Sequence, residues 1–139
     1  MIFSFPYREE RTRFGEIIFR PRATIELQGI DRAWYKFSLY ADSGADVTLL
    51  RRSDCKILGY ELTMGDERPL GGIGKGFVKT YVHRIKLKIG TIEFVCAVAF
   101  ADEEEIPRLL GREDVFEYFR ICFDQPKLST DFITLNSKP

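Results

Sequence analysis

The stretch YADSGADVTLL, residues 40–50, places a carboxylic acid between two apolar runs, and it decides how the rest of the chain is interpreted. Asp42 ends one apolar segment, Ser43-Gly44 turns the chain, and residues 47–50 begin the next apolar segment. Taken alone, Asp-Ser-Gly is a weak motif, because an Asx-type turn uses the same residue types. The two flanking hydrophobic segments predict a carboxylate held at a rigid, partly buried turn.

Most of the chain around this turn is predicted to form short strands. Residues 84–89 alternate basic and apolar side chains, the period-2 pattern of a strand with one exposed face, and this places Lys86 and Lys88 on the wet face. Residues 92–100, IEFVCAVAF, are apolar at nearly every position, which indicates burial on both faces. Further strands are expected at 14–20, 22–28, 34–41, 47–50, 120–123 and 128–135. Strands this short and frequent predict an all-β fold, either a small closed barrel or a sandwich.

One or two short helices are expected beside the strands. Ser53 has the residue type of an N-cap for a helix SDCKILG, and Gly59 has that of its C-terminal stop. Residues 112–119, REDVFEYF, space their apolar side chains at helical intervals, which predicts a short amphipathic helix. The chain of 139 residues has no repeat and no linker, so we expect a single domain spanning 1–139.

Composition excludes several classes of partner. Lys and Arg together equal Asp and Glu together, 21 each, and no basic stripe is seen, so a nucleic-acid partner is not expected. No run approaches the length of a membrane helix, and the start MIFSFPYREERTR has the wrong order for a secretory signal. Three cysteines, Cys55, Cys96 and Cys122, lie far apart in apolar surroundings, so we expect buried thiols and a cytoplasmic location.

The usual metal and nucleophile chemistries are also disfavoured. The chain has one histidine, His83, and no Cys-x-x-Cys pair, so a zinc site is not expected. His83 lies in the middle of a predicted strand and no G-x-S-x-G elbow occurs, which disfavours a serine or cysteine hydrolase. We therefore predict no metal and no cofactor.

A glycine cluster, PLGGIGKGF at residues 69–77, is the second unusual feature. It matches neither a P-loop nor a dinucleotide fingerprint, because the glycines are misplaced and a strand follows them. Glycines between two strands indicate a hairpin tip that can close on an extended ligand, and an ordinary exposed hairpin is the alternative.

Three motifs in order, ADSGADVTLL, PLGGIGKGF and LLGRED, resemble those of the retropepsin-like aspartic proteases. The resemblance runs from about residue 20 to 123 and implies a small closed β-barrel of the acid-protease type, with extensions 1–19 and 124–139 that could contribute to a dimer interface. Two departures stand out: Ser43 replaces the commoner Thr, and Lys75 interrupts the flap glycines.

The family resemblance also implies a mechanism. Aspartic protease chemistry uses two carboxylates that share a proton and flank a water, but this chain has one Asp-Ser-Gly. The resemblance therefore implies a homodimer in which both copies of Asp42 hydrolyse a peptide or an unfolded protein. It assigns active-site support to Ser43, Gly44, Thr48 and Arg112, and substrate binding to Ala45, Asp46, Gly72, Ile73 and Gly74. An ion pair between Arg112 and Asp46 is part of this expectation.

Two alternatives remain open at the level of sequence. The same fold can persist without catalysis, as a dimerisation or peptide-binding module, because a fold does not fix a function. An unrelated β-barrel carrying chance motifs is the other, and it predicts an exposed Asp42 far from any symmetry axis.

Overall fold

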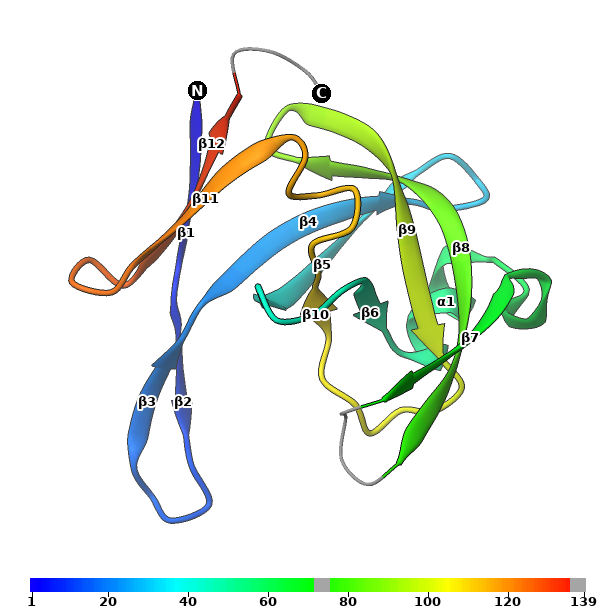
Figure 1. The fold of residues 1–139 in the computed structure, drawn as a ribbon, viewed down its shortest axis with the longest axis horizontal. Coiled ribbons are helices and arrows are strands. Elements are labelled where there is room, and N and C mark those ends of the chain that lie inside the picture. The colour runs from blue at the N-terminus through cyan, green and yellow to red at the C-terminus, as the bar shows by residue number, and fades with distance from the viewer. Residues whose placement is uncertain (72–75, 136–139) are drawn as a thin grey trace.

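The computed structural model describes residues 1–71 and 76–135, and its centre is a closed barrel of six strands (Figure 1). The main sheet has the strand order β4-β5-β10-β6-β9-β8-β7, and a further pairing of β4 with β8 closes it. The barrel strands are β4 (Arg22–Gln28), β5 (Trp34–Ala41), β10 (Leu109–Leu110), β6 (Thr48–Leu50), β9 (Ile92–Ala101) and β8 (Phe77–Ile89). The prediction of a small closed β-barrel is therefore confirmed.

The long hairpin of β8 and β9 follows the predicted hydrophobic pattern over most of its length. In β8, Ile85, Leu87 and Ile89 are buried and Lys86 is exposed, as the period-2 pattern requires. In β9 every residue from Cys96 onward is buried, because one face lines the main core and the other packs on a second apolar cluster. The prediction for β9 is wrong near its start, where Val95 is 45% exposed.

The helix α1 (Arg52–Leu58) is present, but its N-terminus differs from the prediction. Arg51 is the N-cap residue, and the carboxylate of Asp54 accepts its backbone N–H at 3.0 Å. The backbone N–H of Ser53 instead donates to Glu104 at 2.7 Å, so Ser53 is not the cap. Gly59 ends the helix as predicted, with the left-handed φ of 87° that favours glycine. A 3₁₀ turn, η1 (Leu62–Met64), follows.

The predicted helix at 112–119 is wrong, since residues 112–118 form successive turns. The backbone N–H groups of Arg112 and Glu113 are engaged by the loop after Asp42, and Asp114 adopts a left-handed φ of 67°. The Asp114 carboxylate also accepts the backbone N–H of Ala97 at 2.8 Å. The segment retains one i→i+4 hydrogen bond, from the Phe116 N–H to the Arg112 carbonyl at 3.0 Å, and the left-handed backbone at Asp114 prevents a regular helix. Val115 still reaches the core that its spacing predicted.

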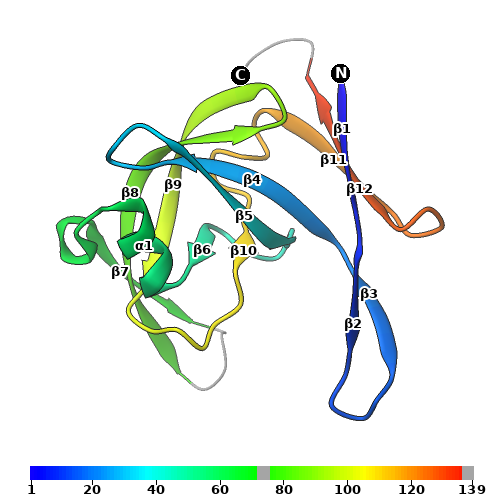
Figure 2. The same cartoon turned by 180° about the vertical axis from the view of Figure 1, so that it is seen from behind.

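The terminal segments pair with each other outside the barrel. β1 (Ile2–Pro6) and β11 (Phe119–Asp124) flank β12 (Ser129–Thr134) in a three-stranded sheet, and the buried Phe132 anchors it. β2 (Arg8–Arg11) and β3 (Ile17–Arg20) form a hairpin that extends away from the barrel (Figures 1 and 2). The strand predicted from residue 14 begins at Ile17, because the hairpin turn, with Gly15 at a φ of 83°, precedes it. A role of these segments in a dimer interface stays a prediction.

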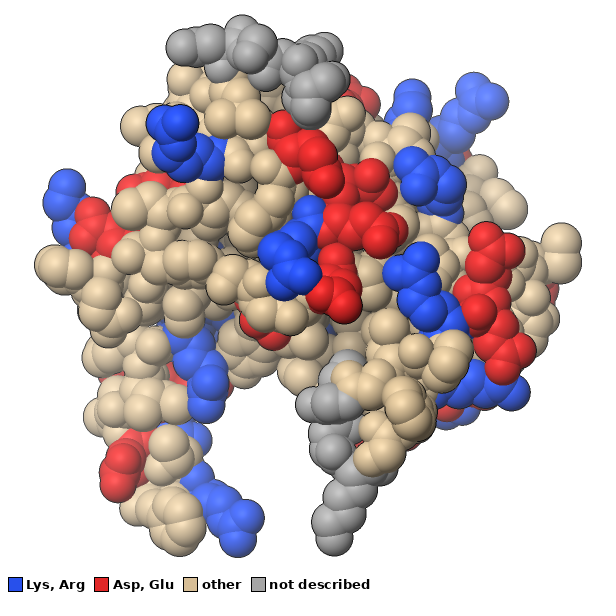
Figure 3. Space-filling model, in the orientation of Figure 1, with Lys and Arg blue, Asp and Glu red and all other residues tan. Residues whose placement is uncertain are grey.

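The charged side chains are interspersed on the face drawn in Figure 3. Several pair locally, for example Lys88 with Glu26 at 3.2 Å. Arg22 is buried, unlike most charged residues of the chain, because its guanidinium lies 4.2 Å from the centre of the Tyr40 ring and donates to Ser38. It therefore belongs to the packing around β5.

The three cysteines carry free thiols, but their environments differ from one another. Cys55 and Cys96 are buried as predicted, and burial raises their thiol pKa to about 11 and about 12 respectively, so both are unreactive thiols. Cys122 is exposed on the edge strand β11, which corrects the expectation that all three are buried. Among the described residues, no helix has the length and apolarity needed to cross a bilayer.

Candidate active site

Asp42 lies where β5 leaves the barrel, in a turn fixed by three hydrogen bonds. Its backbone N–H donates to the carbonyl of Leu110 at 3.1 Å, which ties it to β10. Its carboxylate Oδ1 accepts the N–H of Gly44 at 2.9 Å, and its carbonyl accepts the N–H of Ala45 at 3.2 Å. The half-buried carboxylate is therefore held in an Asx-type turn at a rigid position, as the flanking strands predicted.

The residues after Asp42 keep this turn tight. A Cβ on Gly44 would lie 3.2 Å from Asp42 Oδ1, closer than side-chain carbons ordinarily approach, so the turn favours glycine. Ser43 is exposed, and its carbonyl accepts a hydrogen bond from Arg112 at 2.5 Å. Thr48 is fully buried in β6 and its hydroxyl accepts the N–H of Gly111 at 3.1 Å.

A backbone clamp from residues 111–113 holds the same loop from the other side. Arg112 donates its N–H to the carbonyl of Ala45 at 3.0 Å, and Glu113 donates to that of Asp46 at 2.9 Å. The expected ion pair between Arg112 and Asp46 is present at 2.5 Å, although Asp46 is largely exposed. A Cβ on Gly111 would lie 2.4 Å from the backbone carbon of Val47, so only glycine allows this approach.

A cavity of about 560 Å³ opens beside Asp42 and is lined by residues of all three motifs. Ala45 and Asp46 line it from the Asp42 loop, and Leu70 and Gly71 line it from β7 (Asp66–Gly71), the strand that leads into the glycine cluster. The predicted flap residues Gly72, Ile73 and Gly74 lie outside the described residues. Its full lining is Asp42, Gly44, Ala45, Asp46, Val47, Leu49, Pro69, Leu70, Gly71, Pro107 and Leu109.

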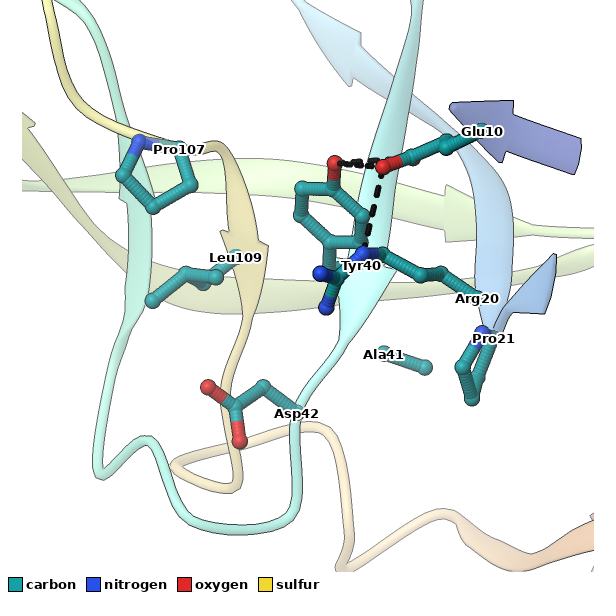
Figure 4. A pocket seen from close by; sticks show the side chains of 8 residues that line it. All are labelled: Glu10, Arg20, Pro21, Tyr40, Ala41, Asp42, Pro107 and Leu109. Atoms are coloured by element: carbon teal, nitrogen blue, oxygen red, sulfur yellow. Dashed lines mark hydrogen bonds and ion pairs between the residues drawn. The ribbon is translucent and has the colours of Figure 1, made fainter. Parts of the chain in front are cut away.

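A second cavity of about 500 Å³ lies against Asp42, and no motif in the sequence predicted it (Figure 4). Tyr40 and Glu10 line it, together with Arg20. Tyr40 precedes Asp42 by two residues, so strand periodicity was a signal for placing the two side chains on one side. Glu10 gave no such signal, because only the N-terminal hairpin brings it near. Asp42, Pro107 and Leu109 line both cavities, so the carboxylate lies where they meet.

The chemistry available here is that of one carboxylate at an open position. Among the residues that the structure describes, Asp42 enters no ion pair, and no three potential metal ligands come together. The side chain of His83 makes its hydrogen bond elsewhere, with its Nε2 3.0 Å from the carbonyl oxygen of Leu62. A positioned carboxylate can move a proton in acid–base catalysis, and activating a water between two acids requires a second one.

Comparison with known proteins places this geometry in context. No protein-family model and no curated protein matches the chain. Among solved structures, a retropepsin-like aspartic protease from Rickettsia conorii aligns with a TM-score of 0.60 and 19% identity, over 95% of this chain and 91% of that one. EIAV protease in complex with the inhibitor HBY-793 aligns with a TM-score of 0.51 and 22% identity, over 74% of this chain and 88% of that one. The chain therefore has the fold of the retropepsin-like aspartic proteases, as its three motifs indicated.

Proposed function

We propose that the chain is an aspartic endopeptidase that acts as a homodimer, with one Asp42 from each copy. The observation that carries this proposal is the position of Asp42. It lies in a rigid turn where two cavities meet, within a fold that aspartic proteases share. A pure scaffold has no need of a carboxylate held at this half-buried turn.

The second acid of the site has to come from a second copy. The chain contains a single Asp-Ser-Gly, and two carboxylates close together share a proton because both cannot ionise. In the proposed site, the ionised Asp42 accepts a proton from a water as that water attacks the peptide carbonyl. The protonated Asp42 donates its proton to the carbonyl oxygen. The first carboxyl then gives its new proton to the leaving nitrogen while the second takes a proton back from the tetrahedral diol, so the C–N bond breaks and no bond forms between enzyme and substrate.

The substrate is proposed to be an extended peptide or an unfolded protein. Ala45 and Asp46 would contact it in the larger cavity, and Gly72, Ile73 and Gly74 would close over it. Ser43, Gly44, Thr48 and Arg112 would keep the two Asp42 turns in register. The three free thiols suit action in a reducing compartment such as the cytoplasm.

The direct test is Asp42→Asn in a peptide-library cleavage assay read by mass spectrometry. We expect cleavage to fall by about 10³-fold or more, since the variant lacks the proton-transfer group. Asp66→Asn, at an exposed position in β7, is the matched control and should cleave like the wild type. Undiminished cleavage by Asp42→Asn at every pH would overturn the catalytic assignment. Peptide binding without cleavage by the wild type would instead favour an inactive binding module.

The shared site has its own experiment. Wild-type protein is incubated with a growing excess of Asp42→Asn until subunits exchange. A site built from two copies then loses activity, because most wild-type chains end in mixed dimers with one carboxylate. Activity that is unaffected by the excess, from a species that sediments as a monomer, contradicts the dimer.

A further inference from the structure

The smaller cavity beside Asp42 is built partly by the N-terminal hairpin. Glu10 comes from β2, Arg20 from the end of β3, and Tyr40 from β5, next to the strand end that carries Asp42 (Figure 4). The hairpin therefore supplies a charged wall to a cavity whose opposite side is the proposed catalytic acid. Any substrate side chain in this cavity meets Glu10.

The Glu10 carboxylate is oriented by the residues around it. The Tyr40 hydroxyl lies 2.9 Å from Oε1 and 2.8 Å from Oε2, and Arg20 Nε lies 3.2 Å from Oε1. Burial and the hydrogen bond to Glu10 raise the pKa of Tyr40, so this hydroxyl remains a donor at neutral pH. The Glu10 side chain is 22% exposed and that of Arg20 is 51% exposed. The acid is thus fixed, while its cationic partner is the exposed member of the pair.

The remaining lining suits a long side chain with a charged end. Pro21, Ala41, Pro107 and Leu109 provide apolar surface between Glu10 and Asp42. Lys and Arg carry aliphatic stems that bury against such surface while their charge reaches a polar partner.

The charge of the cavity favours a cation over an anion. Glu10 and Asp42 are two acids against Arg20, and Arg20 already contacts Glu10. Arg22 also interacts electrostatically with Glu10, but it is buried beside Tyr40 and bonded to Ser38 and does not line the cavity. Arg20, the half-exposed member of its ion pair with Glu10, loses little free energy when it moves into solvent, so an incoming cation can take its place.

From this geometry we propose that the cavity is a subsite for a basic side chain, Lys or Arg, of the peptide substrate, with Glu10 as its counter-ion. The proposal rests on the proposed peptidase function. Since the cavity adjoins Asp42, the basic residue lies close to the cleaved bond. A symmetric dimer presents the subsite twice, once on each side of that bond.

The test compares peptides that differ only in one side chain near the bond that the library identifies. At each position, Lys and Arg are compared with norleucine, which keeps the stem without the charge, and with Glu. We expect kcat/KM to be about tenfold higher for the basic peptides at one position or more, as a charge-assisted hydrogen bond supplies. Glu10→Gln should remove this preference for basic peptides. Glu9→Gln, which changes the exposed residue just before Glu10 in β2, should retain it.

The ratio of kcat/KM between two peptides, measured with one variant, is insensitive to partial loss of folding. Two outcomes overturn the subsite. One is cleavage without a basic preference. The other is a basic preference that survives Glu10→Gln. A preference for Glu that depends on Arg20 would identify an anion subsite instead.

Failure of the peptidase proposal is recognised separately. If the wild type cleaves no peptide, binding of the same peptides to the Asp42→Asn variant is measured by fluorescence anisotropy. Tighter binding of Lys than norleucine peptides, lost when Glu10→Gln is added, supports the subsite without catalysis. Equal binding of the two, or none, rejects it.

Discussion

Asp42 and Asp54 lie on either side of the same short strand, β6, but their surroundings are opposite. The Asp54 side chain is 1% exposed and accepts hydrogen bonds from Arg108 at 2.8 and 3.1 Å and from the N–H of Arg51 at 3.0 Å. Asp42 is half-buried, and its carboxylate accepts the N–H of Gly44 beside two cavities. A carboxylate saturated by donors stabilises the fold, and one that keeps free lone pairs at a cavity is available for chemistry.

The segment at β10 contacts both acids, in two different ways. Arg108, just before β10, donates to Asp54, and the hydrogen bond with Asp54 raises the pKa of that arginine. Leu110, at the end of β10, accepts the backbone N–H of Asp42. The segment at β10 therefore stabilises the helix α1 through a side-chain ion pair, and it stabilises the candidate active-site turn through a backbone hydrogen bond.

The comparison predicts opposite outcomes for the same substitution. Asp54→Asn should lower the free energy of unfolding by about 3 kcal/mol, because it leaves Arg108 without its buried counter-charge. Asp42→Asn should change it by less than about 0.5 kcal/mol, because an amide oxygen still accepts the Gly44 N–H. Urea unfolding of both variants measures this. Equal losses would show that Asp42 is as structural as Asp54.

The clamp on the Asp42 loop is expected to fail when a methyl group enters it. Gly111→Ala should cost about 2–3 kcal/mol of unfolding free energy, since the new Cβ meets the backbone at Val47. Gly15→Ala is the control: it has open space around its Cβ but a positive φ, so it should cost about 1 kcal/mol from backbone strain. A smaller loss for Gly111→Ala than for the control would mean that the clamp can give way.

The buried hydroxyl of Thr48 offers a finer test of the same clamp. Thr48→Val should cost about 2 kcal/mol, because the buried N–H of Gly111 loses its acceptor. Thr48→Ser retains the hydroxyl and loses only a methyl group, at about 1 kcal/mol. Chemical denaturation gives the order of the two variants. If Ser is the more damaging residue, packing matters here more than the hydrogen bond.

The smallest expected effect concerns the helix that carries Asp54. Hydrogen bonds from the side chain and backbone of Ser53 lower the pKa of Glu104 below its ordinary value of 4.5. A lowered folded-state pKa gives stability that is present above the unfolded-state pKa and is lost as pH falls through the folded-state pKa. Glu104→Gln should lower Tm by about 1–2 °C at neutral pH. This difference should vanish once acid protonates the wild-type Glu104, and thermal melts across pH that show a constant difference would contradict it.

The sequence predicted the fold well where local pattern and environment agree. The alternation in β8 and the apolar run of β9 reflect which face of a strand meets the core, and the glycine stop of α1 reflects the left-handed φ at Gly59. It failed at 112–119, where the left-handed backbone of Asp114, whose carboxylate accepts the N–H of Ala97, interrupts the helix that the spacing predicted. It also misplaced Ser53, whose N–H is taken by Glu104 from a distant loop. These errors share a cause: the competing partner is remote in sequence.

The Asp-Ser-Gly motif and its two apolar flanks determined by themselves that Asp42 ends a strand in a tight turn. Because the motif occurs once, the sequence also determined that a single chain supplies one such acid. Local residue types carry this, since turns and strand ends depend on neighbours along the chain. The tertiary structure decided which acid is buried and which is open, and it brought Glu10 of the N-terminal hairpin to the cavity beside Asp42. Long-range strand pairing sets these contacts, and residue spacing along one chain does not encode which distant partner arrives.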